Sequence, residues 1–157
     1  MSLIFVEPRN RWCMAKLNSF SDFEAFQASR AFVREVGLLI RSLKFRQNRV
    51  LFEQMERAAI SVLSNFAEGF ERDGNAEFAQ FLSISKGSIG ELRGQLIYSL
   101  DVGLIEEPLY AELDDKADTA TRLVGSLIRY LSGIELGGHK FGQRSEKKSP
   151  RRLPRNR

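Results

Sequence analysis

Apolar residues recur at spacings of three and four along four long stretches of this chain, and no stretch shows the alternation typical of a β-strand. The four stretches span residues 22–43, 49–70, 76–100 and 109–136. Each stretch gives a helix one apolar face, and only short breaks separate them. The sequence therefore predicts an all-α fold, an up-down-up-down antiparallel four-helix bundle.

Local signals predict where several of these helices begin and end. Ser21 and Glu24 fit a capping box at the start of the first helix. The segment "KFRQN" after that helix predicts a turn, and Gly69 with the following "RDGN" predicts the end of the second helix. Asn75 is the predicted N-cap of the third helix.

The chain of 157 residues suits a single domain with an extension at each end. Residues 1–20 form an N-terminal extension whose apolar side chains could dock on the bundle, and residues 21–138 form the bundle itself. Residues 139–157 are rich in Lys, Arg, Ser and Pro and nearly free of apolar residues. A segment of that composition is predicted to be disordered on its own.

Charge is distributed unevenly along the chain. The tail carries eight Lys and Arg against one Glu, a net charge of +7, whereas the whole chain carries +4, so residues 1–138 carry −3. This asymmetry indicates a polyanionic partner, nucleic acid before membrane, although a solvated tail that only aids solubility is the alternative. The predicted contacts in the tail are Lys140, Arg144, Lys147, Lys148, Arg151, Arg152, Arg155 and Arg157.

A second basic cluster lies at the predicted turn after the first helix, with Arg41, Lys44, Arg46 and Arg49 and no acid among them. In an up-down bundle, the acids around the start of the fourth helix lie at the same end and could neutralise this cluster. Those acids are Glu106, Glu107, Glu112, Asp114 and Asp115. The turn is therefore the second candidate for nucleic-acid contact, after the tail.

The stretch "ISVLSNFAEGFER" (residues 60–72) places small polar and amide side chains on one side of the second helix. In an antiparallel hairpin with the third helix, Arg57 lies opposite Glu91 and Ser61 lies near Ser88. The sequence therefore predicts a half-buried polar seam with an Arg57–Glu91 ion pair, so that removing either charge should damage folding or assembly. The seam residues are Arg57, Ser61, Asn65, Glu68, Ser88 and Glu91.

A catalytic function for the same residues is poorly supported. A serine of the seam would need a base, and the one histidine, His139, lies in the tail. Glu68 and Glu91 are predicted to be far apart along the hairpin. One histidine and one cysteine (Cys13) cannot build a Cys/His metal site. The sequence predicts no enzyme, no catalytic residue, no metal and no cofactor.

A line of small residues runs along the third helix: Ala79, Ser83, Gly87, Gly90 and Gly94. Each glycine inside a helix costs up to about 1 kcal/mol relative to alanine. Such a line allows another helix to approach closely, and the neighbour could belong to the same chain or to another subunit.

Residues 54–96 resemble the 23S rRNA intervening-sequence proteins, also called four helix bundle proteins. The match is specific over this segment and extends loosely over residues 22–136. Leu63 stands where the family usually has proline, so a kink in the second helix is not expected. Glu56 replaces a common arginine. The matching positions are Gln54, Arg57, Ala58, Ser61, Ser64, Asn65, Ala67, Glu68, Gly69, Glu77, Phe78, Phe81, Leu82, Gly87, Ser88, Glu91 and Leu92.

The resemblance implies a small cytoplasmic bacterial bundle. Relatives include the accessory variability determinant (Avd) proteins of diversity-generating retroelements, which form pentamers and bind the reverse transcriptase and its RNA. The expectation is thus a homo-oligomeric accessory protein that binds nucleic acid, RNA more readily than DNA. The alternative is a protein-interaction scaffold of the same family with no direct nucleic-acid role. No membrane segment is expected, because no apolar run approaches the length needed to span a bilayer.

Overall fold

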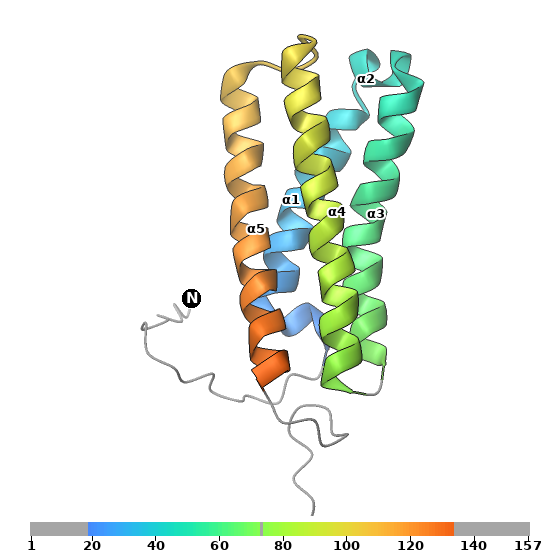
Figure 1. The fold of residues 1–157 in the computed structure, drawn as a ribbon. Coiled ribbons are helices and arrows are strands. Elements are labelled where there is room, and N and C mark those ends of the chain that lie inside the picture. The colour runs from blue at the N-terminus through green and yellow to red at the C-terminus, as the bar shows by residue number, and fades with distance from the viewer. Residues whose placement is uncertain (1–18, 73, 134–157) are drawn as a thin grey trace, which may run out of the picture.

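The computed structural model describes residues 19–72 and 74–133, and every regular element within these ranges is helical. An all-helical bundle is thereby confirmed (Figure 1). The elements are a 3-10 turn η1 (Phe20–Asp22), α1 (Glu24–Ile40), a short α2 (Leu43–Gln47), α3 (Arg49–Glu71), α4 (Asn75–Asp101) and α5 (Glu107–Gly133).

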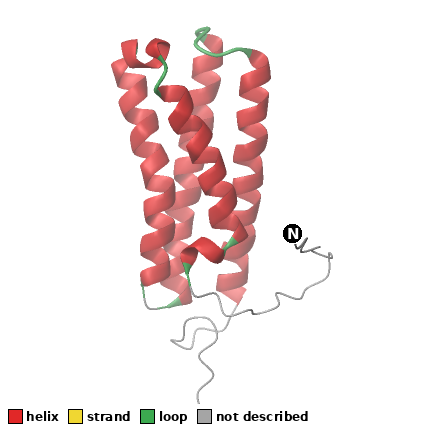
Figure 2. Ribbon diagram, turned by 180° about the vertical axis from the view of Figure 1, so that it is seen from behind, coloured by secondary structure: helices red, strands yellow, loops and turns green. Residues whose placement is uncertain are grey.

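The four long helices stand side by side, and each packs against two of the others. α1 contacts α3 and α5, and α4 contacts the same two helices from the opposite side of the core. The α4–α5 connection and α2 lie at one end of the bundle, and the α3–α4 connection lies at the other (Figure 1). Seen from behind, the loops are confined to the two ends (Figure 2). Each exposed surface along the side of the bundle is therefore formed by two adjacent helices.

The core forms where the apolar faces of the four helices meet. Fully buried side chains include Val36 of α1, Met55 of α3, Leu92 of α4 and Leu127 of α5, at 0–2% exposure. Burying a side chain of this size contributes about 1.5–3 kcal/mol. Near the α3–α4 connection, five phenylalanines pack edge to face, with ring centroids 5.2–6.0 Å apart: Phe23, Phe26, Phe66, Phe70 and Phe78.

The start of α1 differs from the prediction. The capping box belongs to η1, where the Ser19 side chain accepts from the backbone and Asp22 accepts from the Ser19 backbone N–H at 3.1 Å. The predicted Ser21–Glu24 box is wrong, because α1 begins at Glu24 behind Phe23, which makes no side-chain cap. Phe23 is buried instead, so packing of its ring decides how the chain enters the helix.

The segment predicted as a turn is mostly the short helix α2. Its Phe45 side chain is fully buried while its Leu43 side chain is 78% exposed. Asn48 then caps α3 by accepting from the Leu51 backbone N–H at 3.3 Å. A single buried aromatic residue thus ties this connection to the core.

α3 ends at Glu71, within one residue of the predicted end, and Gly69 lies in its last turn. A Cβ at this position would lie 2.6 Å from Cβ of Phe81, so the glycine is needed for close packing of α3 on α4. α4 starts after Gly74, whose φ of 129° favours glycine, and Asn75 is the first helical residue rather than the N-cap. Residues 1–18 of the N-terminal extension, residues 134–138 of the predicted bundle and the whole tail lie outside the described residues.

Candidate functional surfaces

The polar seam between α3 and α4 is centred on two serines. The Oγ atoms of Ser61 and Ser88 are hydrogen-bonded at 2.8 Å, as the antiparallel pairing predicted. Asn65 donates to the Ser61 carbonyl oxygen at 2.9 Å and to its Oγ at 3.0 Å. One turn earlier in α4, buried Ser85 donates to the carbonyl oxygen of Val62 at 2.7 Å. These hydroxyls join the two helices without any charge.

The predicted Arg57–Glu91 ion pair is wrong. Both side chains are exposed, and among the described residues no ion pair joins them. Glu91 instead accepts from Gln95 on its own helix at 3.1 Å. The physical reason is that an exposed ion pair gains little over hydration, so two long side chains at one level of a hairpin need not meet.

Glu68 belongs to a separate group at the α3–α4 connection. Arg72 donates to Glu68 at 2.6 Å, lies 3.8 Å from Glu77, and places its guanidinium 5.3 Å from the ring centroid of Phe81. The hydrogen bond to Glu68 is the main cause of a raised pKa at Arg72. This cluster stabilises the connection and leaves no free carboxylate pair for acid–base chemistry.

The basic cluster predicted near the first turn lies at the opposite end, around α2. Arg41, Lys44, Arg46 and Arg49 are all exposed. Arg49 bonds Glu53 at 2.6 Å, which raises the pKa of Arg49, and the other three form no ion pair within the described chain. Arg41 and Arg46 border a groove of about 660 Å³ between α1 and α3.

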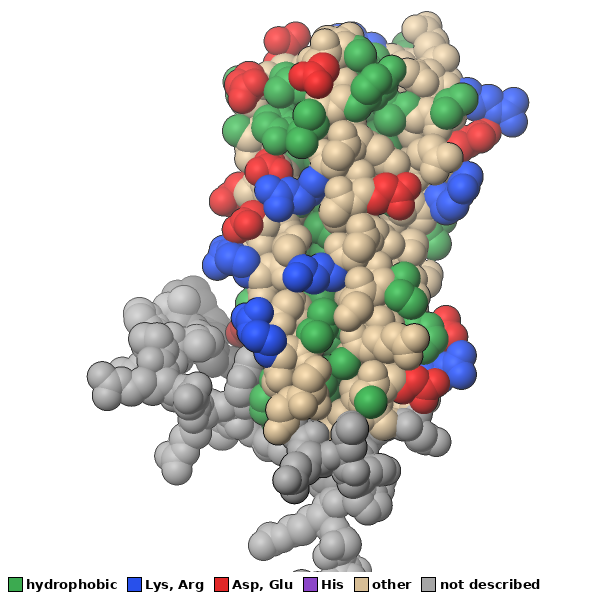
Figure 3. Space-filling view, in the orientation of Figure 1, with side chains coloured by type: hydrophobic (Ala, Val, Ile, Leu, Met, Phe, Trp, Pro, Cys, Tyr) green, Lys and Arg blue, Asp and Glu red, His purple; other side chains and the backbone are tan. Residues whose placement is uncertain are grey.

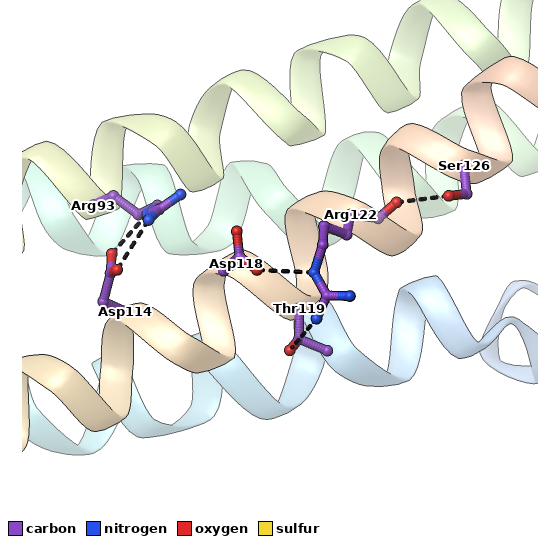
Figure 4. A network of polar contacts seen from close by, with 6 residues as sticks. All are labelled: Arg93, Asp114, Asp118, Thr119, Arg122 and Ser126. Carbon is purple, nitrogen blue, oxygen red and sulfur yellow. Dashed lines mark hydrogen bonds and ion pairs between the residues drawn. The ribbon is translucent and has the colours of Figure 1, made fainter.

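Two of the acids expected to neutralise this end are engaged elsewhere. Asp114 receives a bidentate pair of hydrogen bonds from Arg93, at 2.7 and 3.0 Å, which joins α5 to α4 (Figure 4). The hydrogen bond to Asp114 raises the pKa of Arg93. Glu112 pairs with Lys116 of its own helix. Exposed Glu106, Glu107 and Asp115 form no ion pair in the described residues.

The line of small residues on α4 begins at the core and continues onto the open surface. Ala79 is buried, but Gly87, Gly90 and Gly94 are exposed, and a Cβ built on any of these three would meet nothing within 4 Å. No helix of the described chain therefore uses the close approach that these glycines allow. We call Gly87, Gly90 and Gly94, with the half-exposed Ile97 and Tyr98 further along the helix, the glycine face of α4.

Sequence reasoning named Asp114 but did not find its ion pair with Arg93, nor did it single out Lys86, Gly125 and Arg129. Acidic and basic residues on facing helices were the available signal, but only the register of α4 against α5 shows which of them meet. The Ser61–Ser88 contact of the seam could be predicted from the sequence because a short connection between α3 and α4 fixes their antiparallel pairing.

The family model for the 23S rRNA-intervening sequence protein matches residues 21–126. The chain belongs to this family. The matched span starts in η1 and ends within α5, so it includes the seam and the glycine face of α4. No curated protein matches the chain at a significant level.

Other properties of this family member follow from the described residues alone. None of its described helices is long and apolar enough to cross a membrane. Within the same ranges, no three His, Cys, Asp or Glu side chains gather as metal ligands would. The basic residues from Lys140 to Arg157 lie outside both the family match and the described residues.

Proposed function

We propose that this 23S rRNA-intervening sequence family member is a non-enzymatic accessory protein that binds nucleic acid, RNA more readily than DNA, as a homo-oligomer in the cytoplasm. The observation that carries the proposal is the division of charge, with +7 in residues 139–157 and −3 in the rest of the chain. Lys and Arg spaced by Ser and Pro suit phosphate contacts that are sensitive to salt and tolerant of sequence.

The α2 end of the bundle supplies the second set of contacts in this proposal. Arg41, Lys44 and Arg46 are exposed and form no ion pair within the described residues. Two of the acids that were expected to neutralise them, Glu112 and Asp114, are bonded to Lys116 and Arg93. Free cations at this end are consistent with a weaker site for the same polyanion.

The glycine face of α4 supports the homo-oligomeric part of the proposal. Three exposed glycines and two half-exposed apolar side chains make a surface on which a helix of another copy can pack closely. An oligomer would present several tails to one nucleic acid and so add avidity. The family resemblance favours a pentamer, with a reverse transcriptase of a diversity-generating retroelement as the protein partner.

The test of the nucleic-acid role compares the full chain with a variant in which the eight tail Lys and Arg are replaced by Gln. Binding of a single-stranded RNA is measured across a salt series. We expect the tail variant to lose at least about tenfold in affinity and most of the salt dependence. Equal affinity and equal salt slope for the two proteins would reject the tail as the binding element.

A protein-interaction scaffold is the second candidate, and the groove between α1 and α3 favours it. The groove is lined mainly by apolar side chains, including Val33, Phe52, Ile60 and Leu63, and Ile60 is 60% exposed. A protein that stays bound to the chain after nuclease treatment and is released by Ile60→Arg would favour the scaffold. Loss of every partner on nuclease treatment would favour the nucleic-acid role.

A further inference from the structure

A cleft of about 500 Å³ lies between α4 and α5, separate from the groove between α1 and α3. In Figure 3, blue side chains follow the boundary between these two helices on the visible side of the molecule. The cleft contains two cationic side chains, two glycines, one hydroxyl and one apolar side chain. Its lining residues are Ser83, Lys86, Gly87, Gly125, Ile128 and Arg129.

The two cationic groups converge on one point of the cleft. A Cβ built on Gly125 would lie 3.7 Å from Nζ of Lys86 and 3.7 Å from Nη1 of Arg129, so these two nitrogens are at most about 7.4 Å apart. Arg129 is held in place by Ser126, whose Oγ accepts from Nη2 at 2.9 Å. The glycine leaves free the space between the two charges that a side chain would fill.

No acid balances this pair of cations within the described chain. Lys86 and Arg129 form no ion pair there, and α4 from 78 to 90 and α5 from 119 to 133 contain no Asp or Glu. The neighbouring Arg122, by contrast, is bonded to Asp118 at 2.8 Å (Figure 4). Two like charges facing one space repel each other, and an anion between them removes that repulsion.

We propose that this cleft binds a phosphate group, with Lys86 and Arg129 as its ligands and the glycine floor as the room for it. Charge-assisted hydrogen bonds of about 2.7–2.9 Å to two oxygens of one phosphate span a gap of this width. Arg supplies a planar donor fork and Lys a mobile point charge, a combination suited to a phosphodiester. Arg129 lies one helical turn before the end of α5, and the basic tail follows in sequence.

This inference rests on the proposed function for its ligand, the backbone of a single-stranded RNA, and adds a site on the folded bundle. The test uses the full chain and the double variant Lys86→Gln/Arg129→Gln. The matched control, Arg30→Gln/Arg34→Gln, removes two exposed charges of α1 that form no ion pair in the described residues. Because all four side chains are exposed, circular dichroism melts should show that both variants stay folded.

Two measurements separate the phosphate group from its source. Inorganic phosphate, titrated against chloride at equal ionic strength, should shift the amide NMR signals of Gly87 and Gly125 in the wild type and in the control only. With a short oligouridine, the cleft variant should lose about tenfold in affinity and about 1 in salt slope, against less than about threefold for the control.

The outcomes divide cleanly between the two proposals. Equal RNA affinity for the cleft variant and the control, with no phosphate shift at Gly125, overturns the cleft while leaving a tail-driven function intact. A phosphate shift at Gly87 and Gly125 without any RNA binding by the wild type supports the cleft as a site for a smaller phosphorylated ligand and rejects the proposed function.

Discussion

α4 uses small residues on both of its sides, but in opposite ways. Toward α3, buried Ser85 donates across the interface, and Gly69 on the partner helix lets the two backbones come close. Toward solvent, Gly87, Gly90 and Gly94 meet nothing within 4 Å. Glycine lowers helix stability wherever it stands in a helix. Gly69 offsets this loss through close packing of α3 on α4, whereas the three outer glycines make no such contact in the described chain.

The difference teaches that contacts within the described residues do not explain the outer glycines. A helix without this constraint gains up to about 1 kcal/mol from each replacement of glycine by alanine. We propose that the outer side serves a contact beyond the described residues: a second copy on the glycine face, a phosphate in the cleft, or both. Matched substitutions on the two sides test this division.

The largest contrast is expected from truncating apolar side chains on α4. Leu92 is fully buried and Ile97 is 47% exposed. We expect Leu92→Ala to lower the free energy of unfolding by about 2–5 kcal/mol, because it leaves a cavity in the core. Ile97→Ala should change it by less than about 0.5 kcal/mol. Urea unfolding at protein concentrations low enough to keep the chain monomeric measures both, and similar losses would show that the outer side is also core.

Adding a methyl group should give effects of opposite sign on the two sides. Gly69→Ala forces a Cβ to within 2.6 Å of Phe81, so we expect a net loss of about 1–2 kcal/mol after the gain in helix propensity. Gly94→Ala enters open space and should raise monomer stability by up to about 1 kcal/mol. A loss at both positions in the same assay would mean that Gly94 contacts another part of the chain.

A smaller contrast is expected from removing hydroxyl groups. Ser85 is buried and donates to α3, whereas Ser83 is exposed and donates to its own helix at Ala79. Ser85→Ala should cost about 0.5–1.5 kcal/mol. Ser83→Ala should be neutral or slightly stabilising, since alanine is the better helix former. Thermal unfolding of the two variants in parallel measures this difference. Equal unfolding midpoints would show that the Ser85 hydrogen bond does not stabilise the α3–α4 interface.

The smallest effect is expected at Arg57, which sequence reasoning had placed in a half-buried ion pair. Since Arg57 is exposed and forms no ion pair in the described residues, Arg57→Ala should change the free energy of unfolding by less than about 0.5 kcal/mol. Glu91→Ala should be equally mild. A double-mutant cycle between the two positions should give no coupling, and coupling well above the error would restore the pair.

The helices and the α3–α4 pairing could be predicted because they depend on periodicity and on one short connection. Residues 49–70 were predicted as helical and α3 spans Arg49–Glu71, and Ser61 meets Ser88 where an antiparallel hairpin places it. The Arg57–Glu91 error has a different cause. Antiparallel pairing predicts which residues lie at the same height along the two helix axes, but not the direction in which a long side chain points. Hydration also competes with ion pairing between exposed charges.

The ends of elements were harder to predict because packing overrides local propensity there. Ser21 and Glu24 had the right spacing for a capping box, but the 3-10 turn ends at Asp22, and buried Phe23 separates it from α1, which begins at Glu24. α2 was missed because five residues are too few to show a helical period. The cleft between α4 and α5 was missed because its residues come from two helices whose register no local pattern reveals.

The exposed glycines of α4 also predict how selection for stability and selection for activity should differ along this helix. Consider a library in which each α4 residue is replaced by every other amino acid. Its variants are scored once for cellular abundance and once for biological activity. At most positions, the effects of substitution on the two scores should have the same rank order. Gly87, Gly90 and Gly94 should not, because substitutions there raise abundance through a better helix and lower activity by blocking the outer surface. Where the two rankings diverge along α4 would map the surface that the protein keeps free at the expense of its own stability.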